Sequence, residues 1–512
     1  MSKTNKIKGM QILNEKLENY KYFTASLVFL VLSKVISLLF RMGSRIIIAR
    51  YSSVDIYGLF SVIWNEMTFI STVALLGLGQ SLTINLPREN REEKINSVLS
   101  ALMFSLIVGV ISLVISLIFY IINLDNTYKY SALISTFFII FLFVQFVFIG
   151  LKDFLGYFIQ ILTQSLTMFI LIIILRNILT IDLMVYLTFG SIAFSLIISF
   201  IYLLLRTKIS LKSISLSDLK IFNFSKKRLS LFLVDIVNSI ILYLLLKIPQ
   251  VMVNNSLAGY INVAFSLVTF LLIPPQMISI VLGPIISKDF HESRISELNN
   301  SFRLSLGLLY IIQGIAIIVF SYFGNFFIKL LYGNEYITGS FLIFYGFLLA
   351  IIIDSFNYPF AFYIRNTNHE RLFALGKIIS LVCFIVPAPL MLYFFDDFVN
   401  LAIPVAYLIS ITSLLSFYFF YTIKLNERFE LKDVKNITVW LAFVFISLIS
   451  AMLTVNFIAN QYYVLLILFG NLIAFGGFIV ITKIINIKSI FIDLKEIIIN
   501  LKNKNQKETI EP

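Results

Sequence analysis

The sequence predicts an all-α polytopic membrane protein with about fourteen transmembrane helices. Of the 512 residues, 59% are apolar and only 13% are charged, so a water-soluble fold would lack a polar surface. Apolar runs of 18 or more residues recur along the chain, and each is long enough to cross a hydrocarbon core of ~30 Å. Lys and Arg gather in alternate loops, which is the pattern expected of a chain that crosses a membrane repeatedly.

Glycine, proline and charged residues bound the apolar windows and place the individual helices. Six are expected in the first half of the chain, at 22–49, 56–85, 97–122, 130–150, 153–175 and 181–205. Six more are expected at 230–251, 257–286, 300–322, 339–363, 371–394 and 399–422, followed by two at 437–457 and 462–482. We therefore predict two six-helix lobes, at 22–205 and 230–424, and a C-terminal helix pair at 437–482.

The charges of the loops predict the orientation. With the N-terminus in the cytoplasm, the cytoplasmic segments hold 30 Lys and Arg and the external loops hold four, as the positive-inside rule requires. The basic tail 1–21, the basic linker 206–229 and the amphipathic, basic tail 483–512 are then all cytoplasmic, at the cell membrane. The net charge of +13 indicates this topology and attraction to anionic lipid rather than nucleic-acid binding.

The residue types that carry most enzyme chemistry are scarce. Cys383 is the single cysteine, and the two histidines, His291 and His369, lie far from each other in the sequence. A phosphate-binding GxxxxGK[ST] loop and a catalytic constellation are both missing from the sequence. We expect neither a metal nor another cofactor, and we do not expect an enzyme.

Six cationic residues fall inside predicted helices: Lys34, Arg41, Arg45, Lys247, Arg303 and Lys377. At ~100° per residue, Arg41 and Arg45 lie within about 20° of Lys34, so the first helix carries one cationic stripe. A central Lys or Arg costs ~2.5 to 3.5 kcal/mol on insertion scales. The cost is reasonable if Lys34, Arg41, Arg45 and, from the seventh helix, Lys247 line a cavity that receives an anion.

Other interpretations of these cations remain open. Arg41 and Arg45 could extend to the outer headgroups, and Lys34 could pair with Glu66 of the second helix. Asp235 of the seventh helix and Asp354 of the tenth could bind a proton or cation, or neutralise a cavity lysine.

Prolines and a short repeat add two further expectations. Pro274, Pro275 and Pro284 predict a kink in the eighth helix. Asp55-Ile56-Tyr57-Gly58 opens the second helix, and Ala258-Gly259-Tyr260 opens the eighth at the matching place. The match supports two parallel six-helix repeats, an architecture that places a transporter's substrate at the repeat interface.

Three segments resemble the polysaccharide flippase branch of the multidrug, oligosaccharidyl-lipid and polysaccharide exporter (MOP) superfamily. They are Ala49-Arg50-Tyr51 with Tyr57-Gly58-Leu59-Phe60 and Gly77-Leu78-Gly79-Gln80-Ser81; Ala258-Gly259-Tyr260-Ile261-Asn262-Val263-Ala264 with Pro275 and Gly283-Pro284-Ile285-Ile286-Ser287; and Leu330-Leu331-Tyr332-Gly333-Asn334-Glu335-Tyr336. The resemblance implies fourteen helices, two lobes in a V and a cationic central cavity for the pyrophosphate and acidic sugars of a polyprenyl-linked glycan.

The resemblance also implies partners and leaves competing functions. The expected partners are the lipid-linked oligosaccharide, membrane lipid and a glycan polymerase or glycosyltransferases. The main alternative is a cation-coupled drug or metabolite exporter of the same superfamily. A lipid II flippase and a membrane glycosyltransferase or ligase are further alternatives, although the external loops are too short for the domain that the enzyme would need.

Overall fold

The computed structural model describes residues 35–75, 91–122, 126–207, 226–279, 294–394, 398–425, 431–457 and 461–482, together with residues 79, 82, 86, 286 and 290. Every regular element in these ranges is a helix. Eleven helices of the described part are long and apolar enough to span a membrane. The prediction of an all-α polytopic membrane protein is confirmed, while both tails and most of the linker, at 208–225, lie outside the described ranges.

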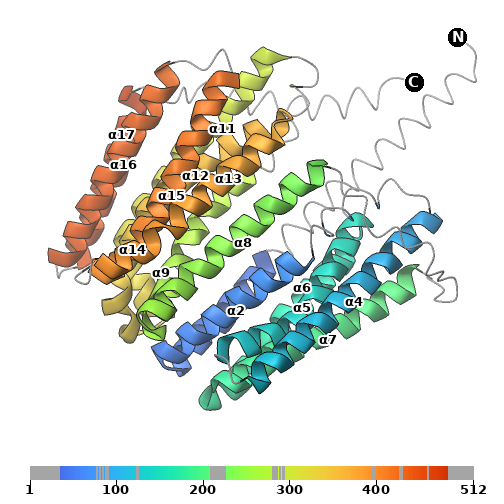
Figure 1. The fold of residues 1–512 in the computed structure, drawn as a ribbon. Coiled ribbons are helices and arrows are strands. Elements are labelled where there is room, and N and C mark those ends of the chain that lie inside the picture. Colours follow the sequence, from blue (N-terminus) through green and yellow to red (C-terminus); the bar gives the residue numbers. More distant parts are fainter. Residues whose placement is uncertain are drawn as a thin grey trace, which may run out of the picture.

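The first half of the chain forms the N-terminal lobe, residues 35–207. Residues 35–51 are helical. They are followed by α2 (Val54–Ala74), α4 (Arg91–Ile121), α5 (Asn126–Gly150), α6 (Phe154–Leu175), the 3-10 turn η2 (Arg176–Ile178) and α7 (Ile181–Thr207). In Figure 1 this lobe is the blue to teal group of helices, and α2 lies along its border with the second group.

The second half forms the C-terminal lobe, residues 226–425, and a final helix pair. The lobe contains α8 (Lys226–Met252), α9 (Asn255–Val268), the 3-10 turn η5 (Thr269–Leu272), α11 (Ile295–Leu331), η6 (Asn334–Tyr336), α12 (Ile337–Asn366), α13 (Glu370–Ile385), α14 (Pro387–Phe394) and α15 (Val399–Leu425). The pair α16 (Leu431–Phe457) and α17 (Gln461–Thr482) packs on α11, on the side away from the N-terminal lobe (Figure 1).

Five helices differ clearly from their predicted ranges, and two of them, α4 and α16, simply begin six residues earlier. The eighth helix changes to a 3-10 turn at Thr269–Leu272 and resumes at 273–279, because Pro274 and Pro275 offer no backbone N–H to an α-helical ladder. The eleventh helix is divided at Val386, directly before Pro387, for the same reason. The ninth is longer than predicted and continues to Leu331, so its external loop is much shorter than the sequence suggested.

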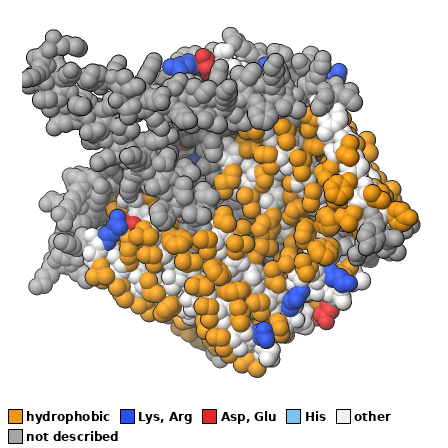
Figure 2. Space-filling model, turned by 180° about the vertical axis from the view of Figure 1, so that it is seen from behind, with side chains coloured by type: hydrophobic (Ala, Val, Ile, Leu, Met, Phe, Trp, Pro, Cys, Tyr) orange, Lys and Arg blue, Asp and Glu red, His pale blue; other side chains and the backbone are white. Residues whose placement is uncertain are grey.

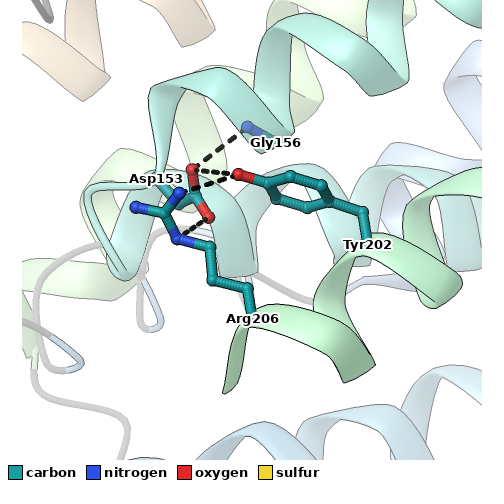
Figure 3. Close-up of polar contacts among 4 residues, drawn as sticks. All are labelled: Asp153, Gly156, Tyr202 and Arg206. Atoms are coloured by element: carbon teal, nitrogen blue, oxygen red, sulfur yellow. Dashed lines mark hydrogen bonds and ion pairs between the residues drawn. The ribbon is translucent and has the colours of Figure 1, made fainter. Parts of the chain in front are cut away.

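A polar cluster fixes one end of the N-terminal lobe. Asp153 precedes α6 and accepts a hydrogen bond from the Gly156 backbone N–H (3.1 Å), as a helix N-cap does. Its carboxylate also accepts from the Tyr202 hydroxyl (3.2 Å) and pairs with Arg206 Nε (3.0 Å) (Figure 3). These contacts tie the loop between α5 and α6 to the last turns of α7.

The outer surface is apolar. Large aliphatic and aromatic side chains are exposed along α4, α7, α11 and α17, and Figure 2 shows a broad apolar face whose charged side chains lie mainly at its margins. Exposing such a surface to water would be energetically unfavourable, whereas lipid tails match its polarity. The exposed apolar residues therefore mark the lipid-facing side of the two lobes.

The lobes meet where α2 crosses α9, at the two halves of the short sequence repeat. A Cβ atom at Gly58 would lie 1.9 Å from the carbonyl oxygen of Asn255, and one at Gly259 would lie 2.7 Å from the carbonyl oxygen of Val54. Only glycine allows the two backbones this close approach. Asn262 Nδ2 then donates to Tyr57 Oη and Ser61 Oγ, each at 2.8 Å.

Further contacts hold the same end closed, and we call these contacts and the α2–α9 crossing the seal. Arg50 donates to the carbonyl oxygens of Leu331 (2.8 Å) and Leu330, at the end of α11. The Tyr336 hydroxyl donates to the Ala49 carbonyl oxygen (3.2 Å). The loop charges predict that this end faces outward, so the lobes are joined on the side that we expect to be external.

Candidate functional site

A cavity lies between the lobes beneath the seal, and we call it the arginine chamber. Its volume is about 470 Å³. The first helix contributes Arg41 and Arg45, and the C-terminal lobe contributes Thr269, Gln276 and Tyr332. Tyr332 also packs against Tyr57, with ring centroids 6.4 Å apart, so the seal forms one wall of this chamber.

Arg41 and Arg45 place two positive charges on one face of the first helix, as their spacing predicted. Arg41 Nη2 donates to Gln164 Oε1 at 3.4 Å, and its Nε is buried without a hydrogen-bond partner among the described residues. The Arg45 guanidinium lies over the Trp64 ring, 5.8 Å from its centroid. Among the described residues, the side chains that line the chamber include no Asp or Glu that could balance the two arginines.

Like charges four residues apart on a helix repel each other, and here the lining is mostly apolar with neutral polar side chains such as Gln145 and Gln276. An anion between the two guanidinium groups would remove this repulsion and pair the free N–H groups. Arginine forks match the paired oxygens of phosphate groups. The chamber can therefore bind a phosphate-like or carboxylate-like anion.

A second cavity adjoins the first inside the C-terminal lobe, and we call it the mixed chamber. Its volume is about 380 Å³, and it shares Thr269 and Gln276 with the arginine chamber. Asp354 and Lys377 both line it and interact electrostatically. Neutral polar side chains from α8, α12 and α15 also line this chamber: Asn238, Asn357, Tyr358, Tyr407 and Tyr418.

The other sequence-predicted site residues lie elsewhere. Lys34 is outside the described ranges. Lys247 lines neither chamber; it is buried between the lobes, where its Nζ donates to Thr127 Oγ1 at 2.8 Å and lies 4.3 Å from the centroid of the Tyr128 ring. Glu66 is buried and accepts a hydrogen bond from the Tyr243 hydroxyl at 3.3 Å.

Asp235 also lines neither chamber, whereas Asn238, one turn further along α8, lines the mixed chamber. Sequence reasoning did not select Lys377 as a site residue, although an intramembrane lysine was the available signal. It also assigned Arg365 to a loop, but Arg365 lies in the last turn of α12 and lines the mixed chamber. Gln276 has no charge and carried no signal in the sequence.

Residues 23–290 match the family described as polysaccharide biosynthesis protein. This match covers more than half of the chain. The chain belongs to the polysaccharide biosynthesis protein family. A search of curated proteins found no match to this sequence.

Solved structures with the same fold are transporters of the MOP superfamily. A multidrug resistance transporter of the MATE family, in an inward-facing conformation, gives a TM-score of 0.60 at 12% identity, over 79% of this chain and 100% of that one. The lipid II flippase MurJ, in an inward closed conformation, gives 0.59 at 14% identity, over 89% of this chain and 98% of the other. A MOP transporter from Pyrococcus furiosus, reported with a binding pocket of reverse polarity, gives 0.52 at 14% identity over 78% and 94%.

These likenesses establish the fold of the superfamily. The resemblance seen in the sequence is thus confirmed at the level of family and fold. The proteins named by these structures are transporters and a flippase rather than enzymes. This member of the polysaccharide biosynthesis protein family is therefore a multi-pass membrane protein with the fold of MOP transporters and flippases.

Proposed function

We propose that this protein is a flippase that moves a polyprenyl-(pyro)phosphate-linked oligosaccharide across the cell membrane by alternating access, for the assembly of surface polysaccharide or glycoprotein glycans. The observation that carries the proposal is the arginine chamber, which lies between the lobes and has two guanidinium groups but no acidic side chain among its described lining residues. A linked diphosphate is the anion that such a pair suits. The family match supports the same conclusion.

The geometry fits a headgroup that crosses while its lipid tail stays in the bilayer. The diphosphate would lie between Arg41 and Arg45, and opening of the seal at α2 and α9 would release it on the other side. We propose that both termini are cytoplasmic, that membrane lipid surrounds the lobes, and that a glycosyltransferase supplies the cargo and a glycan polymerase or a further glycosyltransferase receives it. Nothing in this scheme requires a cofactor or nucleic acid.

A test begins with deletion of the gene and mass spectrometry of lipid-linked oligosaccharides and finished surface glycans. We expect accumulation of the lipid-linked precursor and loss of the surface product, and the accumulated molecule identifies the cargo, including lipid II if that is the substrate. Normal amounts of both would contradict the proposal.

Complementation then tests the two arginines. The double variant Arg41→Gln, Arg45→Gln should restore surface glycan about tenfold less well than the wild type, since a hydrogen bond to a charged group contributes ~1.5–3 kcal/mol and ~1.4 kcal/mol is a factor of ten. Arg371→Gln is the matched control, because Arg371 is exposed on α13 and lines neither chamber. Full complementation by the double variant, at equal membrane levels, would remove the arginine chamber from the mechanism.

The second candidate is a cation-coupled drug or metabolite exporter. The specific observation in its favour is the buried Asp354 of the mixed chamber, which could accept a proton or Na⁺. Susceptibility to cationic dyes separates the two functions. An exporter predicts increased susceptibility on deletion, with normal pools of lipid-linked precursor, whereas the flippase predicts the reverse.

A further inference from the structure

We propose that the mixed chamber is a saccharide subsite, which holds the first sugar residues of the cargo while the arginine chamber holds the diphosphate. The inference rests on the proposed function and adds the place and chemistry of sugar recognition. The two chambers are in contact. Thr269 and Gln276 line both of them, so one elongated headgroup can occupy the two together.

The wall of the mixed chamber contains an unused acceptor. Asn357 is 4% exposed. Its Nδ2 donates to Asp354 Oδ1 at 3.0 Å, while its Oδ1 is buried without a hydrogen-bond partner among the described residues. Leaving a buried acceptor unpaired is unfavourable, and a ligand hydroxyl that donates to this oxygen would remove the cost.

Donors and acceptors are mixed in this chamber in a way that suits hydroxyl groups. Asp354 accepts, Lys377 and Arg365 donate, and the side-chain amide of Asn357 does both. A sugar hydroxyl also donates and accepts, so a ring with several hydroxyls can satisfy this set, whereas a bare phosphate, which only accepts, suits the two arginines. The difference in polarity between the chambers therefore matches the two parts of a glycosyl diphosphate.

Aromatic side chains provide the apolar surface that the carbon face of a sugar ring needs. Tyr358, Tyr407 and Tyr418 line the chamber, and tyrosine combines an apolar ring with a polar hydroxyl. The Tyr358 hydroxyl accepts from Gln276 Nε2 at 2.9 Å, which joins the aromatic wall to the shared border. A volume of about 380 Å³ lies within the ~300–1,000 Å³ typical of small-molecule sites.

The test measures binding to the full-length protein in lipid nanodiscs, using two matched water-soluble probes. The first is a short-prenyl diphosphate without sugar, and the second is the same compound with one sugar, taken as a hexose, an N-acetylhexosamine and a hexuronic acid in turn. We expect at least one sugar to tighten binding about threefold or more, as one or two added hydrogen bonds would. Asn357→Leu, close in volume, and the milder Tyr407→Phe should reduce this gain without changing affinity for the sugar-free probe, and Arg371→Gln is the control.

The outcomes separate the two proposals. If the sugar-free diphosphate fails to bind, the proposed function falls and this inference with it. If it binds but no sugar tightens binding, or both variants keep the whole gain, only the saccharide subsite is wrong. If the variants instead change the dependence of binding on Na⁺ or pH and leave the gain from sugar intact, the chamber holds a coupling ion and the inference is overturned.

Discussion

The two chambers lie next to each other but differ in their charges. The arginine chamber presents two guanidinium groups and no acid among its described lining residues, whereas the mixed chamber combines Asp354 with Lys377 and Arg365 among amides and tyrosines. A charge without a counter-charge in an apolar surrounding is costly, and a pair of opposite charges reduces that cost internally. The first chamber therefore gains most from an external anion, while in the second Asp354 already offsets part of the positive charge of Lys377 and Arg365.

The comparison also separates stability from function. Lys377 and Asp354 interact electrostatically within the lobe, so we expect the loss of either side chain to affect stability even without cargo. The two arginines repel each other, so in the proposed function they would bind the anion at some expense of stability. Variants at the seal, at Asp354 and Lys377, and at Lys247 should therefore affect the protein to a decreasing extent.

Gly58→Leu should abolish transport, because the new side chain would collide with the backbone of α9 and force the seal above the arginine chamber apart. In a Cys383→Ser background, Ser61→Cys reports this opening through a membrane-impermeant thiol reagent. We expect faster labelling in the Gly58→Leu protein. Gly190→Ala is the control, since a Cβ atom there meets nothing within 4 Å. Unchanged labelling and transport would show that the seal accommodates the larger side chain without opening.

Asp354→Asn and Lys377→Met should each lower the thermal unfolding temperature in detergent, because each removes one of two interacting charges, the buried Asp354 or the half-buried Lys377. The double variant should recover most of the loss, with a coupling of about 0.5–3 kcal/mol. Additive losses would show that the two side chains do not stabilise each other. The same cycle applied to Arg41 and Arg45 should give coupling of the opposite sign, since replacing either arginine relieves repulsion.

Lys247→Met should have the smallest effect on the chambers. The lysine donates to Thr127 outside both cavities, so affinity for a sugar-free short-prenyl diphosphate should stay within about twofold of the wild type, as expected for a residue beyond direct contact. Arg41→Gln, measured beside it, should weaken this affinity strongly. Equal losses of affinity in the two variants would instead indicate that Lys247 belongs to the anion site, as the sequence suggested.

Periodicity and charge in the sequence predicted the fold, because lipid imposes strict rules on length, polarity and loop charge. The first-helix spacing also placed Arg41 and Arg45 on one face correctly, since helix geometry is local. Lys377 and Arg365 could not be assigned to a site from the sequence. A cation in or near a membrane helix is recognisable there, but the residues that surround it are not. Gln276 carried no signal, and its role as the border between the chambers depends on contacts between segments far apart in the chain.

The sequence by itself thus determined the membrane class, the helices, the repeat and the presence of a cationic stripe, all of which follow from composition and local geometry. Only the tertiary structure decided which intramembrane charges share a cavity. It moved Lys247 into the lobe interface, set Lys377 opposite Asp354 and joined the repeat halves through Gly58 and Gly259. Packing between distant helices creates these neighbours, and no local pattern encodes it.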